Sequence, residues 1–218
     1  MAPVSVVTRE IRALYSAETI TVYQAYSPEI ACPAAAAGRF PDRYDRGRMT
    51  WIKPSFLWMM YRSSWGTAAG QERVLAIQIR REGFEWALAH SVSSGYDGRM
   101  HASRDEWKRE MRRSSVRIQW DPERDLDLQP MPARSLQVGL RGEAVHRYID
   151  EWIVGVDDVT ERSHAVHALT REGQAAEAGR LLPVERPYPL TGGLASRIGA
   201  THPQLPLTDA QPDGSGAG

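Results

Sequence analysis

Alternating apolar and polar positions along the chain predict several β-strands. Val116, Ile118 and Trp120 alternate with polar neighbours, which is typical of a strand with one buried face. Ile20–Ala25 is rich in β-branched and aromatic residues, which favour strands. The same reasoning predicts strands at Leu136–Leu140, at Val74–Ile79 and at Phe84–Ala89, the last two joined by a turn at Arg80–Gly83 into an antiparallel hairpin.

Capping residues and helical spacing predict helices between these strands. Ser27 followed by Pro28 is a helix-start signal, and the helix that it opens is expected to end near Gly38. Ser55–Ser64 is apolar on nearly every side, which predicts a buried helix. The remaining predicted helices are Arg104–Arg113, Glu143–Trp152 and Thr160–Glu172.

The order of these elements predicts a single α+β domain over residues 1–190. Strands and helices are interspersed without strict alternation, so we expect a mostly antiparallel sheet flanked by helices. The strands can form one continuous sheet or a sheet split into two. The sequence has no glycine-rich phosphate loop of dinucleotide or Walker type, which argues against a doubly wound parallel sheet. Residues 191–218 are rich in glycine, proline, serine and threonine and are predicted to form a flexible tail.

Composition narrows the possible functions. The 27 basic and 27 acidic residues give a net charge of zero, so no overall positive field attracts nucleic acid. The single cysteine, Cys32, excludes an intramolecular disulfide and a cysteine-based zinc site. The longest apolar run, near Pro54–Tyr61, is far shorter than the roughly 20 residues of a membrane helix. With no leader-like N-terminus, we expect a cytoplasmic protein without membrane contact.

The most distinctive segment lies between residues 48 and 66. Trp51, Trp58 and Trp65 recur every seven residues, and Lys53, one of only two lysines, lies between the first two. Arg48 and Arg62 flank them, so aromatic faces lie beside cations, as in a site for a base and a phosphate. The same pattern is typical of a buried helix with a structural cation–π contact, and the sequence leaves both interpretations open.

Two further segments carry candidate chemistry. On the first predicted strand, Gln24 and Tyr26 share one face and Tyr23 lies on the other, so the first pair is a candidate cleft wall or simply packs. At the end of a later strand, a proline turn brings Asp121 and Glu123 to the rim of the sheet, where a catalytic carboxylate is useful. The alternative there is an Asp-Pro turn with surface ion pairs.

Metal chemistry has weak support. His164 and His167 are three residues apart on a predicted helix, but no third ligand follows at a suitable spacing. We therefore expect ordinary helix-face residues and no metal.

Several longer motifs resemble a family of bacterial and fungal proteins, domain of unknown function 4291. The resemblance covers roughly Arg9 to Leu190. It is carried by VYQAYSPEIA, RMTWIKPSFLWMMYRSSW, VLAIQIRREGFEWAL, VRIQWDPERDL, RSLQVGLRG and LLPVERPYPL.

The unit Tyr-Gln-Ala-Tyr, Ser-Pro-Glu-x-Ile-Ala and Gly-Arg-Phe is also similar to the opening of ADP-ribosyltransferases. In that family a His or Arg on the first strand binds the NAD ribose, an aromatic and serine segment holds nicotinamide, and a Glu at a sheet edge orients the ribose. The resemblance implies an ADP-ribosyltransferase-like fold. It sets Gln24 at the first-strand position, residues 51–55 in the nicotinamide segment and Glu123 at the carboxylate position.

The resemblance therefore implies an NAD-dependent enzyme that transfers ADP-ribose to a nucleic acid, a protein or a small molecule. Glu123 and Gln24 are its implied catalytic residues. The implied contacts to the nucleotide are Tyr23, Tyr26, Arg48, Trp51, Lys53, Ser55 and Arg62. One alternative is a non-catalytic module that binds a nucleotide or a nucleic acid by stacking and arginine contacts. Another is an interaction domain whose tryptophans are all core.

Overall fold

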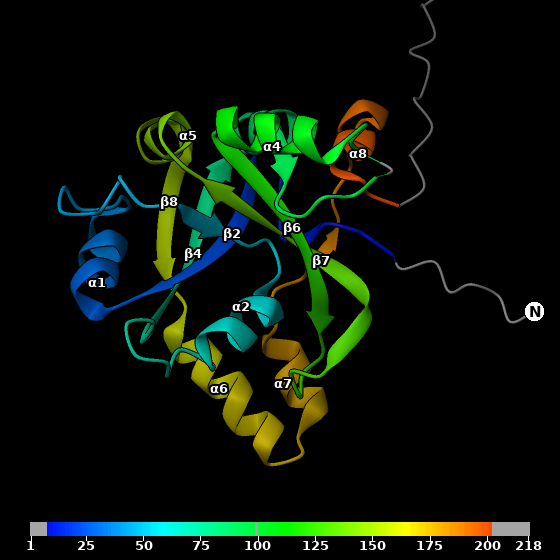
Figure 1. Cartoon of the computed structure of the whole chain (residues 1–218). Helices are drawn as coiled ribbons and strands as arrows, with labels where there is room; N and C mark the ends of the chain where they lie inside the picture. The colour runs from blue at the N-terminus through cyan, green and yellow to red at the C-terminus, as the bar shows by residue number, and fades with distance from the viewer. Residues whose placement is uncertain (1–7, 99, 202–218) are drawn as a thin grey trace, which may run out of the picture.

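The computed structural model describes residues 8–98 and 100–201, which form an α+β fold built on two main sheets (Figure 1). The first sheet is antiparallel, in the order β2 (Thr19–Tyr26), β4 (Arg73–Arg80) and β8 (Ile153–Asp158). The second has the order β3 (Thr50–Ile52), β7 (Pro130–Leu140), β6 (Val116–Arg124) and β5 (Ser91–Ser93), in which only β5 and β6 run parallel. A short ribbon pairs β1 (Arg12–Ala13) with β9 (Arg186–Pro187). The predicted fold class, including the split sheet, is confirmed.

Helices cover both ends of the sheets (Figure 1). At one end, α2 (Phe56–Ser63) lies near α6 (Thr160–Arg171) and α7 (Ala175–Leu181). At the other end lie α4 (Arg104–Arg113), α5 (Glu143–Arg147) and α8 (Gly192–Ile198), and α5 continues into a π-helix at Tyr148–Trp152. Helix α1 (Pro28–Ala37) packs against the three-stranded sheet, and α3 (Arg81–Ala89) follows β4 directly. Within the described ranges, none of these helices has the length and apolar content needed to cross a bilayer.

One face of each main sheet packs into a common core. Val22 and Ile77 contribute from the first sheet, and Ile118 and Val138 contribute from the second; all four are at most 1% exposed. Ile118 and Val138 are apolar members of alternating patterns, so burying one face explains the period of two in β6 and β7.

Among the described residues, one antiparallel bridge joins the two sheets, between Tyr23 and Lys53. The Tyr23 amide donates to the Lys53 carbonyl at 2.7 Å, and the Lys53 amide donates back to the Tyr23 carbonyl at 3.3 Å. Tyr23 belongs to β2 of the three-stranded sheet, and Lys53 directly follows β3 of the four-stranded sheet. On β2, Gln24 and Tyr26 continue the face that carries the core residue Val22, and they lie beside an opening between the sheets.

The predicted hairpin at Val74–Ala89 is wrong in its second half, because residues 81–89 form helix α3. Phe84, Trp86 and Leu88 alternate with smaller or polar residues, which suggested a strand. Phe84, Ala87 and Leu88 also have helical spacing, and it is this face that is buried in the core. Tertiary burial of the helical face decides between two periods that the short segment satisfies equally well.

The predicted tail boundary at residue 190 is also wrong, because Gly192–Ile198 form helix α8. Thr191 caps this helix by accepting a hydrogen bond from the Leu194 amide at 3.4 Å. Ile198 is fully buried, and its carbonyl accepts a hydrogen bond from the Trp120 indole at 2.8 Å. The helix is therefore part of the packed domain. The rest of the predicted tail, residues 202–218, lies outside the described residues.

Candidate functional site

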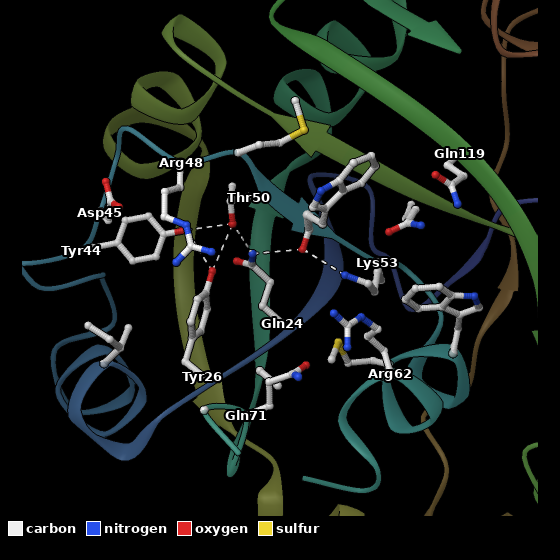
Figure 2. A pocket seen from close by; sticks show the side chains of 18 of the residues that line it. Gln24, Tyr26, Tyr44, Asp45, Arg48, Thr50, Lys53, Arg62, Gln71 and Gln119 are labelled. Carbon is white, nitrogen blue, oxygen red and sulfur yellow. Dashed lines mark hydrogen bonds between the residues drawn. The ribbon is translucent and has the colours of Figure 1, made fainter. Parts of the chain in front are cut away.

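A cavity of about 610 Å³ opens where the two sheets meet. Its wall includes six of the side chains that the sequence nominated, from β2, from β3 with the loops on either side of it, and from α2 (Figure 2). These residues are Gln24, Tyr26, Arg48, Trp51, Lys53 and Arg62. They are separated by up to 38 residues in the sequence (62 − 24) yet line one opening. The volume lies within the range of small-molecule sites, about 300–1,000 Å³.

Gln24 is fixed by hydrogen bonds on both ends of its amide. Its Nε2 donates to Thr50 Oγ1 at 2.6 Å and to the Trp51 carbonyl at 3.1 Å. Its Oε1 accepts a hydrogen bond from the Tyr148 hydroxyl at 2.8 Å. Since Tyr148 belongs to the π-helix, an irregular turn positions a buried polar group behind the cavity wall. Gln24 therefore orders β3, and only its Oε1 keeps spare capacity for a hydrogen bond.

Three hydroxyl groups form a cluster beside this amide (Figure 2). Thr50 Oγ1 lies 2.8 Å from the Tyr44 hydroxyl and 3.1 Å from the Tyr26 hydroxyl, and the two phenols are 2.9 Å apart. Burial raises the pKa of Tyr26 well above its ordinary value and also raises the pKa of Tyr44. Both phenols therefore stay protonated at neutral pH and remain hydrogen-bond donors.

Positive groups outnumber negative ones around the opening. Arg43, Arg48, Arg62 and Lys53 line it, and Asp45 is the one carboxylate among its described lining residues. Figure 2 shows Arg48 on one side of Gln24, near the tyrosines, and the Lys53 and Arg62 side chains on the other. An anionic ligand is favoured by this distribution.

Lys53 is the most unusual of these cations because its residue is only 6% exposed. Its Nζ donates to the Trp51 carbonyl at 3.3 Å and lies 5.2 Å from the centroid of the Trp58 ring. Burial, together with the neighbouring charge of Arg62, lowers the pKa of Lys53 to about 7, although Asp121 opposes the shift. None of the ion pairs within the described ranges includes Lys53.

The three regularly spaced tryptophans have different surroundings. Trp51 is half-buried and Trp58 is 7% exposed, and both line the cavity. The Trp58 Nε1 is buried with no hydrogen-bond partner within the described part of the chain. Trp65 lies outside this cavity and stacks on His167, with ring centroids 5.1 Å apart. Two of the three rings therefore fit the stacking interpretation, and the third packs against a helix.

Tyr23, Ser55 and Glu123 do not line the cavity but gather at the start of α2. Glu123 Oε1 accepts a hydrogen bond from Ser55 Oγ at 2.8 Å, and Ser55 caps the helix by accepting from the Trp58 amide at 3.2 Å. Tyr23 packs edge-on against Phe56, with ring centroids 5.5 Å apart. Burial raises the pKa of Glu123. These contacts are those of a structural cluster beneath the cavity, which leaves Glu123 without the predicted access to a ligand.

Sequence reasoning missed several polar residues of the wall. Gln119 and Gln137 are paired directly across β6 and β7, and both line the cavity. Asp121 orients them, because its two oxygens accept hydrogen bonds from Gln119 Nε2 at 2.8 Å and from Gln137 Nε2 at 2.6 Å. The polar members of the alternating pattern carried this signal. Their convergence depends on the pairing of β6 with β7, which no local sequence pattern contains.

Comparison with protein families gives a match over residues 10–188 to a domain of unknown function (DUF4291). The chain belongs to the DUF4291 family. All six nominated residues of the cavity fall within the part of the chain that defines this DUF4291 domain. No curated protein matches the chain.

Proposed function

We propose that the protein binds a nucleotide in this cavity, and that the nucleotide is NAD, used as a donor of ADP-ribose. The observation that carries the binding step is the convergence of Gln24, Tyr26, Arg48, Trp51, Lys53 and Arg62 on one opening of about 610 Å³. A dinucleotide needs cations for its pyrophosphate, flat apolar faces for its rings and hydrogen-bonding groups for its sugars.

The wall offers these groups in suitable numbers. Arg48 and Arg62 are exposed residues that line the cavity, and a guanidinium group can form paired hydrogen bonds to phosphate oxygens. Trp51 and Trp58 line the cavity and supply ring faces. Gln119 and Gln137, held by Asp121, supply amide groups that suit ribose hydroxyls.

Transfer of ADP-ribose is the part of the proposal that rests on the resemblance to ADP-ribosyltransferases. Breaking the bond to nicotinamide builds positive charge on the ribose, and a nearby carboxylate stabilises that charge. Glu123, the residue implied by the resemblance, hydrogen-bonds Ser55 outside the cavity. The binding step therefore has support from the geometry, and the transfer step is tested separately.

Calorimetry with NAD tests the binding step. We expect Arg62→Gln to weaken NAD binding by about 10- to 100-fold, because a hydrogen bond to a charged group contributes about 1.5–3 kcal/mol. Arg180→Gln is the matched control, since Arg180 is exposed on α7 and pairs only with Glu177, at 3.0 Å. Absence of NAD binding by the purified protein would remove the proposal. Release of free nicotinamide from NAD by the wild-type protein would support the transfer step.

A second candidate function is favoured by the rings and arginines together. Stacking surfaces beside arginines also bind single-stranded nucleic acid, with an affinity that falls steeply as salt rises. Salt-sensitive binding of a short RNA or DNA, together with no binding of NAD, would favour this function over the first.

Gly139 provides a test that substitutes none of the residues lining the cavity. It is paired with Trp51 across β7 and β3, and a Cβ atom added there would lie 3.0 Å from the Trp51 indole. Gly139→Ala is therefore expected to displace the ring and to weaken NAD binding about tenfold, or ~1.4 kcal/mol. In Gly155→Ala, where the nearest atom is an ordinary 3.8 Å away, calorimetry should give unchanged affinity. Equal affinities in both variants would show that Trp51 does not contact the ligand.

A further inference from the structure

We propose that the amine of Lys53 is a nucleophile that forms a Schiff base with an aldehyde or ketone carrying a phosphate or carboxylate group. The inference rests on the anion-binding cavity of the proposed function but does not require NAD. It gives Lys53 a covalent role that differs from pairing with a phosphate.

The surroundings of Lys53 suit a nucleophile better than a phosphate ligand. Its Nζ uses one of three possible hydrogen bonds, a long one of 3.3 Å to the Trp51 carbonyl. The ring of Trp58 covers one side of it, and the positive charge of Arg62 adds to the effect of burial. A lysine that is desolvated next to another cation loses its proton easily, which is how amines are activated for attack on carbonyl carbons.

The arginines define the class of carbonyl compound. Arg43, Arg48 and Arg62 line the same cavity, so an anionic group on the substrate can bind while its carbonyl carbon meets the amine. Arg43 also donates a hydrogen bond to the Glu29 carbonyl, so Arg48 and Arg62 are the freer pair.

The reaction is balanced without any other reactant. The neutral amine attacks the carbonyl carbon, and one proton passes from the attacking nitrogen to the carbonyl oxygen to give a carbinolamine. Loss of one water then replaces the C=O bond with a C=N bond, so amine and carbonyl give imine and water with no change in oxidation state. Sodium cyanoborohydride reduces the imine to a stable secondary amine, which fixes the adduct for measurement.

The chain contains its own control, because Lys53 and Lys108 are its only lysines. Lys108 lies on α4 with a side chain 58% exposed, 4.0 Å from Asp105. We would treat the full-length protein with cyanoborohydride and either glyceraldehyde 3-phosphate or glyceraldehyde, and map both lysines by mass spectrometry. The phosphate-bearing probe and its uncharged counterpart differ only in the group that the arginines would bind.

At neutral pH, Lys53 is expected to react with glyceraldehyde 3-phosphate at least about tenfold faster than Lys108, although Lys108 is far more accessible. The preference should fall at least about tenfold with glyceraldehyde or in Arg62→Gln. The rate at Lys53 should reach half its maximum near a pH of about 7. Lys53→Arg, which keeps the positive charge, should remove the adduct from this position only.

Faster labelling of Lys108 than of Lys53 in the wild-type protein would overturn the inference. So would equal labelling rates at Lys53 with glyceraldehyde 3-phosphate and with glyceraldehyde. This comparison needs no variant, so a folding defect cannot obscure it. The two proposals also fail separately. NAD binding without selective labelling would leave the proposed function and remove the nucleophile, and selective labelling without NAD binding would do the opposite.

Discussion

Gly83→Ala is expected to lower the free energy of unfolding by about 3 kcal/mol, the upper part of the usual range for overpacking a core. Gly83 is buried in α3, and a Cβ atom added there would lie 2.4–2.7 Å from ring atoms of Trp152. The nearest of these atoms is Trp152 Cγ, through which the indole is attached to Cβ. Rotation of the ring about this bond leaves Cγ in place and therefore does not relieve the clash. Trp152 is 2% exposed and packed in the main core, so relieving the clash must move its neighbours.

Gly179→Ala is the matched control for this experiment. Gly179 also lies within a helix, α7, but it is exposed and nothing lies within 4 Å of the added atom. That change should stabilise the protein by about 0.5–1 kcal/mol, because alanine favours a helix over glycine. Urea unfolding of both variants measures the difference. A Gly83→Ala protein as stable as the wild type would mean that α3 and the π-helix are not packed as described.

Gly83→Ala is also expected to disturb the candidate site. Trp152 contacts Tyr148 with ring centroids 6.4 Å apart, and the Tyr148 hydroxyl holds the Gln24 amide. A displaced Trp152 therefore disturbs the hydrogen bonds that order β3 and the cavity wall. Trp152, Tyr148 and Gln24 therefore connect the packing of the core to the geometry of the cavity.

Local signals were sufficient for much of the fold. Alternation at Val116–Trp120 identified β6, the Ser27-Pro28 start signal identified α1, and the apolar run at Ser55–Ser64 identified α2. The sequence did not identify β3 and β5, because each has only three residues and forms by pairing with a distant strand. Short strands of this kind depend on tertiary contacts that no local pattern contains.

The candidate site was predictable where unusual residue types gathered in one segment. Lys53, Trp51 and Arg62 were found because a rare lysine lies among aromatic residues. Thr50 and Tyr44 were missed, since their role comes from a hydroxyl cluster assembled from β2, β3 and a loop. Glu123 was nominated from its place near a sheet edge, but the side chain bonds to the helix cap at Ser55 instead of facing the cavity. The position of a residue along a strand does not determine which side chains it contacts at the edge of the sheet.

The cluster beneath the cavity leads to the second large effect, on the pH dependence of stability. Glu185 Oε1 accepts a hydrogen bond from the Phe56 amide at 2.7 Å, at the start of α2. Burial raises the pKa of Glu185 to about 8, and the nearby Glu123 adds to this shift. The Phe56 hydrogen bond and the charge of Arg12 act in the opposite direction.

A raised pKa in the folded state means that stability falls as pH rises. The unfolded chain releases the Glu185 proton at an ordinary pKa of about 4.3, whereas the folded protein keeps it up to about pH 8. Between these values the folded state binds one more proton, so the free energy of unfolding decreases across the interval and levels off above it. Because solvent reaches part of this residue and screens its charge, we expect a loss of about 2 kcal/mol from this group.

Glu185→Gln should remove this loss, because glutamine matches the protonated acid in shape and its amide oxygen accepts the same hydrogen bond from Phe56. Urea unfolding at about pH 5 and about pH 8.5 should therefore give a variant that is as stable as the wild type at the lower pH and more stable by about 2 kcal/mol at the higher one. Glu18→Gln, at an exposed turn, should leave the wild-type slope unchanged. If Glu185→Gln kept that slope too, the carboxyl group would have to be ionised in the folded protein at neutral pH. The start of α2 would then hold a negative charge beside the cavity that the arginines make positive.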